Sequence, residues 1–177
     1  MLTYAADSLD SELLLDLARH ANGTFGFIPD AKILATDISD AALAVARKNA
    51  EALQIDQQIT FSQGDLLEAL NVGEPVDLIL SNPPYIGRDE QGTLDENVRK
   101  YEPEMALFAG QDGMAVIDRL ILQAPAFLND GGFLIFEISP MIAEACRLRL
   151  EQSEALDLVK IAKDYSGNER IVVARKS

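Results

Sequence analysis

The sequence has one cysteine, one histidine and no tryptophan among its 177 residues. With Cys146 alone, an internal disulfide is impossible, which is typical of proteins from a reducing compartment. A run of about 18 apolar residues, the length that spans a bilayer, is absent, so we expect no transmembrane helix. Residues 1–10 also lack the basic and apolar regions of a secretory signal. These absences predict a cytoplasmic protein without a membrane anchor.

Basic residues are scarce, because 15 Lys and Arg face 29 Asp and Glu, for a formal net charge of -14. Binding to a phosphate backbone relies on Lys and Arg that displace condensed counterions. The charge therefore argues against stable binding to nucleic acid. It would attract a basic protein partner, although acidity that serves only solubility is an equally good explanation. The sequence does not indicate the oligomeric state.

Short β-branched segments alternate with longer segments of helical periodicity, which predicts an α/β protein with a mainly parallel, Rossmann-like sheet. No repeat or linker interrupts residues 1–177, and the length suits one domain. The expected strands are 2–6, 32–37, 58–62, 76–81, 133–138, 155–162 and 170–175. The expected helices are 9–21, 39–53, 113–128 and 140–152, with Ser39 as an N-cap and 129–132 as a helix stop. A turn at 166–168 would pair the last two strands as a hairpin, which makes the C-terminal strand antiparallel.

Polar residues follow three of the predicted strands, where an open parallel sheet binds its ligands. Asp37 can accept hydrogen bonds from both hydroxyls of a ribose, or it can cap the next helix, although Ser39 already suits that role. Asp65 can accept from the amino group of adenine, or it can cap residues 66–70. Neither residue identifies a cofactor by itself.

The most specific pattern is Asn82-Pro83-Pro84-Tyr85, directly after a buried strand. Two prolines fix the backbone and remove two N–H donors. The Asn82 side-chain oxygen and the Pro83 carbonyl can then each accept one hydrogen of a planar NH₂ group, which orients its nitrogen toward a methyl donor. Tyr85 can stack on the planar group. The alternative is a rigid turn that only ends the strand.

With this motif, the chain resembles the release-factor glutamine N5-methyltransferases (the HemK/PrmC family). The resemblance also rests on residues 35–39, 94–103, 106–110, 112–113, 131–133 and 168–170. It implies a seven-stranded methyltransferase fold and S-adenosylmethionine contacts at Asp37, Asp65, Leu66 and Asn82. It further implies a substrate pocket at residues 82–85, with catalysis by Asn82, Pro83 and Tyr85. The substrate would be the Gly-Gly-Gln glutamine of a peptide-chain release factor, methylated by direct displacement without a histidine base, so that His20 is structural.

The chain departs from the family in two places. It has no counterpart of the helical N-terminal domain, and residues 6–12 stand where the family has a glycine-rich loop. Asp10 and Glu12 would bring negative charge toward the cofactor's carboxylate, which predicts weak cofactor binding. Two other functions therefore stay open, an adenine N6-methyltransferase that flips its base and a catalytically silent fold that binds proteins.

Overall fold

The computed structural model describes residues 2–4, 32–68, 75–84 and 113–177. The elements are β1 (Leu2–Tyr4), β2 (Ile33–Asp37), α2 (Asp40–Ala52), η2 (Asp56–Gln58), β3 (Ile59–Gln63), β4 (Val76–Ser81), α5 (Ala115–Phe127), β5 (Leu128–Glu137), η4 (Pro140–Ile142), α6 (Ala143–Glu151), β6 (Leu156–Lys163) and β7 (Glu169–Lys176). The predicted α/β alternation is confirmed. The predicted helix 9–21, His20, the segment 6–12 and Tyr85 lie outside the described residues, as do the motifs at 94–103, 106–110 and 112.

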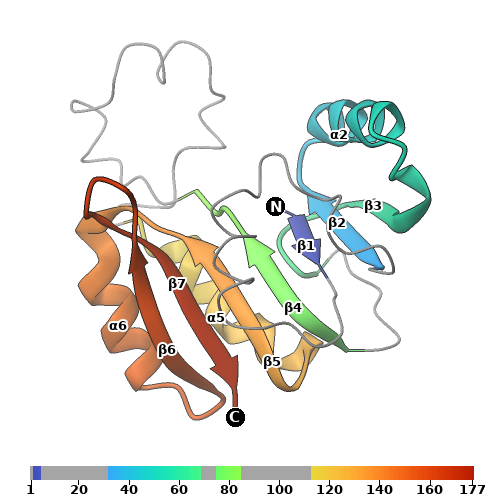
Figure 1. Ribbon diagram of the computed structural model, residues 1–177. Helices are drawn as coiled ribbons and strands as arrows, with labels where there is room; N and C mark the ends of the chain where they lie inside the picture. The colour runs from blue at the N-terminus through green and yellow to red at the C-terminus, as the bar shows by residue number, and fades with distance from the viewer. Residues whose placement is uncertain (1, 5–31, 69–74, 85–112) are drawn as a thin grey trace.

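The strands form two hydrogen-bonded sheets, β1-β2-β3 and β4-β5-β7-β6. Strand β1 lies against both β2 and β4, so it is the edge of the first sheet that faces the second sheet (Figure 1). The pairs β2–β3 and β4–β5 are parallel, whereas β1–β2, β5–β7 and β6–β7 are antiparallel. The antiparallel C-terminal hairpin is confirmed, but the sheet is mixed rather than mainly parallel. Side chains alternate identically in both strand directions, so the sequence pattern could not reveal that β1 is reversed.

Helix α2 begins where the sequence predicts. The Ser39 hydroxyl accepts a hydrogen bond from the Ala42 backbone N–H at 3.2 Å, as an N-cap does. Leu43 and Ala50 are buried, as expected for one face of the helix. Helical periodicity predicts that Leu53 lies on the same face, but this residue is 61% exposed. The helix has ended by that residue, so the helical periodicity no longer directs its side chain.

Helix α5 runs directly into β5, without the helix stop that the sequence suggests at 129–132. Val76 pairs with Leu128 and Leu78 pairs with Phe133, so residues 129–132 form an irregularity inside the strand pairing. Gly131 has a φ of 80° there, a conformation that glycine adopts without strain. Gly131 and Gly132 thus belong to β5 and do not end the helix.

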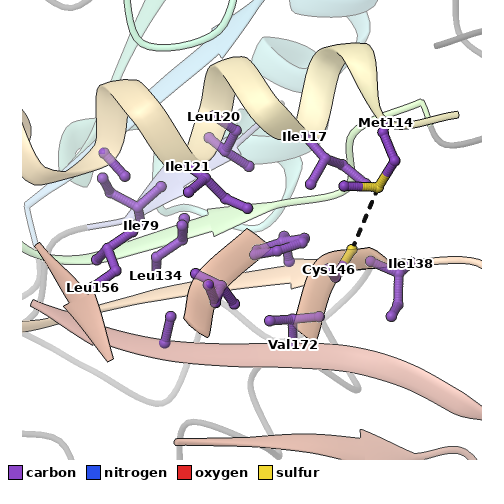
Figure 2. Packing of buried hydrophobic residues seen from close by; sticks show 14 of the residues in the cluster. Ile79, Met114, Ile117, Leu120, Ile121, Leu134, Ile138, Cys146, Leu156 and Val172 are labelled. Atoms are coloured by element: carbon purple, nitrogen blue, oxygen red, sulfur yellow. Dashed lines mark hydrogen bonds between the residues drawn. The ribbon is translucent and has the colours of Figure 1, made fainter. Parts of the chain in front are cut away.

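Helices α5 and α6 pack on one face of the four-stranded sheet (Figure 2). Helical spacing predicts that one face of α5 lies in the core. The residues of that face are buried, namely Ile117, Ile121 and Ala124, together with Met114 just before the helix. Cys146 of α6 lies beneath them with its sulfur 3.8 Å from that of Met114. Within the described ranges, no helix has the length and apolarity needed to cross a membrane.

The burial of Cys146 gives a testable expectation. Loss of solvent raises the pKa of its thiol from 9.0 to about 12, with a smaller contribution from the negative charge of Asp118. The reactive thiolate at neutral pH is then about a thousandfold rarer than for a thiol of ordinary pKa. We expect Ellman's reagent to react with the native chain at least about 100-fold more slowly than with the chain in guanidinium chloride. Equal rates in the two conditions would show that this core opens readily.

Candidate functional site

The end of β2 and the loop after β3 are bound together. Asp37 and Gln63, the last residues of β2 and β3, are partners in the parallel pairing. The Gly64 N–H donates to the Asp37 carbonyl at 3.0 Å. The Thr36 hydroxyl donates to the Leu66 carbonyl, also at 3.0 Å. Three residues predicted for the site, Asp37, Asp65 and Leu66, are therefore neighbours at one edge of the sheet.

Asp37 is half-buried, and its carboxylate has a local role. The oxygen Oδ1 accepts a hydrogen bond from the Ser39 backbone N–H at 2.8 Å. Asp37 thus contributes to the turn that leads into α2, while the Ser39 hydroxyl caps the helix itself. The turn fixes the carboxylate at the carboxyl end of β2, where a ligand of this sheet would lie.

The loop that carries Asp65 has a constrained backbone. Leu66 adopts a φ of 50°, which is uncommon for a residue other than glycine, and its side chain is buried. Leu67 is fully buried in the core cluster beneath α5. The Glu68 N–H donates to the Asp65 carbonyl at 3.2 Å and closes the turn. Burial of both leucines therefore holds Asp65 at the surface.

The Asp65 carboxylate points toward a residue that the sequence analysis did not single out. Arg119 of α5 places Nη2 2.9 Å from Asp65 Oδ2 and 3.4 Å from Glu68 Oε1. The hydrogen bond from Arg119 to Asp65 raises the pKa of the guanidinium against the opposing effect of burial, so Arg119 stays cationic. Within the described part of the chain, the carboxylate contacts Arg119 and not the backbone of 66–68, so capping by Asp65 is not seen. Arg119 is the single basic residue of α5, but nothing local in the sequence links it to Asp65.

The predicted substrate motif follows β4. Ser81 ends that strand in a buried position, whereas Asn82 is exposed. Pro83 is buried and Pro84 is half-buried, so the prolines hold the backbone beneath an accessible Asn82 side chain. The Ser81 hydroxyl is buried and has no hydrogen-bond partner among the described residues. Asn82 is thus exposed and not buried in the interior.

Apolar packing and polar contacts of α5 connect the two parts of the site. Asp37 ends a strand of the three-stranded sheet and Asp65 follows another, whereas Asn82 follows a strand of the four-stranded sheet. Ile33 of β2 packs with Leu78 and Leu80 of β4. Across residues 32–68 and 75–84, no hydrogen bond is seen from Asn82 to either aspartate. The observed contacts between the two parts include this apolar packing and the polar contacts of Arg119 and Gln123 with the loop after β3.

The fold is that of methyltransferases, as solved structures confirm. The ribosomal protein L11 methylase from Lactobacillus delbrueckii subsp. bulgaricus matches with a TM-score of 0.55 and 23% identity, over 93% of this chain and 65% of that chain. The O-methyltransferase TomG from Streptomyces achromogenes, solved in complex with SAM, matches with a TM-score of 0.54 and 10% identity, over 84% of this chain and 63% of that chain.

Sequence comparison identifies the family. The RMKL-like methyltransferase domain matches residues 6–117, and the chain belongs to this family. A release factor glutamine methyltransferase from Rhodopirellula baltica is 40% identical over 150 residues, which are 85% of this chain and 51% of the relative. The resemblance inferred from the Asn82 motif is therefore confirmed. The chain spans about half the length of the curated relatives it matches.

Proposed function

We propose that residues 1–177 form the methyltransferase domain of a release factor glutamine methyltransferase. It transfers a methyl group from S-adenosylmethionine to the side-chain amide nitrogen of a glutamine, in the Gly-Gly-Gln motif of a peptide-chain release factor. The observation that carries the proposal is the exposed Asn82 on a proline-fixed backbone at the end of a buried strand. The buried single cysteine supports a cytoplasmic location.

The residues at the strand ends suit the cofactor. The Asp37 carboxylate, fixed by its turn, would accept hydrogen bonds from the ribose hydroxyls. Asp65, beside the buried Leu66, would accept from the amino group of adenine, and Asn82 would lie next to the methyl group. S-adenosylmethionine would supply an activated methyl group on its sulfonium. The O-methyltransferase TomG, which has a similar fold, was solved in complex with SAM, and this supports the choice of cofactor.

At residues 82–85, the proposed substrate site, the chain would act by holding the glutamine amide. Asn82 Oδ1 and the Pro83 carbonyl would each accept one N–H, and Tyr85 would cover the planar group. S-adenosylmethionine would supply the methyl group to the nitrogen held by these acceptors, and the amide nitrogen would lose one proton to solvent. Positioning of this kind lowers a barrier by as much as roughly 7–11 kcal/mol in favourable cases.

Methylation of a release factor tests the proposal directly. The chain is incubated with labelled S-adenosylmethionine and either a release factor or the same protein with its motif glutamine changed to glutamate. We expect label on the first substrate alone and the mass of one added methyl group on that glutamine. Label on duplex DNA instead would support the adenine N6-methyltransferase, although a net charge of -14 argues against DNA binding. Cofactor binding by calorimetry without transfer to either substrate would support the silent fold.

A further inference from the structure

Arg119 connects the two halves of the proposed site. It belongs to α5, which packs on the four-stranded sheet, yet it pairs with Asp65 in the loop that follows β3. Gln123, one turn further along α5, donates from Nε2 to Glu68 Oε1 at 2.9 Å. Two side chains of one helix therefore hold two carboxylates of this loop.

The contact with Arg119 involves only one of the two carboxylate oxygens of Asp65. Arg119 binds Oδ2, and among the described residues no hydrogen bond or ion pair is seen to the other carboxylate oxygen, Oδ1. Glu68 reaches the same nitrogen of Arg119, at 3.4 Å. Without the guanidinium, two negative side chains would share this place and repel each other. Because Asp65 is 45% exposed, its repelled carboxylate could turn toward water.

We propose that Arg119 is a positioning residue that determines the preference of this site for an adenine ring. By fixing Oδ2, it directs the free oxygen Oδ1 of Asp65 at the 6-amino group of the cofactor's base. This inference rests on the proposed function, because it requires that a cofactor with an adenine ring binds beside Asp65. The proposed cofactor site thus gains Arg119 of α5, which would act through Asp65 without touching the ligand itself.

A second ion pair of α5 provides a matched control. Arg149 of α6 donates from Nε to Asp118 Oδ1 at 2.7 Å and from Nη2 to Asp118 Oδ2 at 3.0 Å. This pair is as short as that of Arg119 and also connects α5 to another element. Its loss therefore reports what a purely structural ion pair contributes.

The test compares two ligands that differ at one position of the base. S-adenosylhomocysteine offers a 6-amino donor, whereas S-inosylhomocysteine has a 6-oxo acceptor that Asp65 cannot bind. In calorimetric titrations of the 177-residue chain, Arg119→Met should weaken S-adenosylhomocysteine about tenfold, the size of one charge-assisted hydrogen bond. The affinity for S-inosylhomocysteine should stay within about twofold, since that ligand never gains this bond. Arg119→Lys should retain part of the preference, and Arg149→Met all of it.

Adding Glu68→Gln to Arg119→Met should restore part of the adenine preference, because it removes the repulsion on Asp65. If Arg119→Met keeps the full preference of the wild type, the inference is wrong while the proposed function stands. If the wild-type chain binds neither ligand, the proposed function fails and the inference with it. Melting curves show whether Arg119→Met is folded. If it is not, an unchanged preference in Arg119→Lys would overturn the inference.

Discussion

Replacement of Asn82 by alanine is expected to reduce methyl transfer to a release factor by about 10²- to 10³-fold, the effect of removing one preorganised polar group at a reacting centre. Asn82 is exposed, so its truncation creates no cavity and the fold should persist. The amide of the substrate would keep one acceptor, the Pro83 carbonyl, and lose the second. The nitrogen would then no longer be held from both sides.

The measurement is the single-turnover rate with saturating cofactor and release factor, together with a melting curve. Asn49→Ala removes an exposed asparagine from α2, and serves as the control for truncation of an exposed amide. It should leave the rate unchanged. Wild-type turnover by the Asn82→Ala variant would rule out the proposed grip on the amide.

Asp37→Asn is expected to weaken S-adenosylmethionine binding about tenfold, because one charge-assisted acceptor for the ribose is lost. The asparagine oxygen can still accept from the Ser39 N–H, so the unfolding temperature should stay close to that of the wild type. Asp37→Ala removes both the acceptor for the ribose and the acceptor for the Ser39 N–H. It should weaken binding by about 10- to 100-fold and lower the free energy of unfolding by about 1 kcal/mol.

Ser39→Ala separates cofactor binding from the stability of the turn. It removes the helix cap and should cost about 1 kcal/mol of stability, but it leaves the Asp37 carboxylate in place. Calorimetric titration should therefore give Ser39→Ala the affinity of the wild type. If Ser39→Ala loses as much affinity as Asp37→Asn, Asp37 acts through the turn and not by contact with the ribose.

The sequence predicted the elements whose signals are local. β4 has the predicted bounds, because a buried apolar run ends at two prolines that cannot continue a strand. α2 starts directly after Ser39, whose hydroxyl accepts a hydrogen bond from the first turn. Asp37 and Asn82 lie at strand ends as expected, because each directly follows an apolar run.

The features that the sequence could not predict depend on contacts between distant segments. Arg119 and Asp65 are far apart in the chain, and no periodicity connects them. The direction of β1 is another such feature. Tyr4, its last residue, pairs with Ile33 at the start of β2, so the chain leaves β1 at the edge opposite Asp37. The comparison of residues 6–12 with a glycine-rich loop stays a prediction, because those residues lie outside the described part of the chain.

Backbone hydrogen bonding is interrupted between β1 and β4, since the described strands form two separate ladders there. Asp37 and Asp65, the proposed contacts of the cofactor's ribose and adenine, lie across this seam from Asn82, the proposed contact of the acceptor amide. The cofactor would therefore be aligned with the amide by side chains that cross the seam, such as Ile33 against Leu78 and Arg119 against Asp65. Small changes in the volume of those side chains would shift one half against the other and slow the chemistry before they unfold the protein.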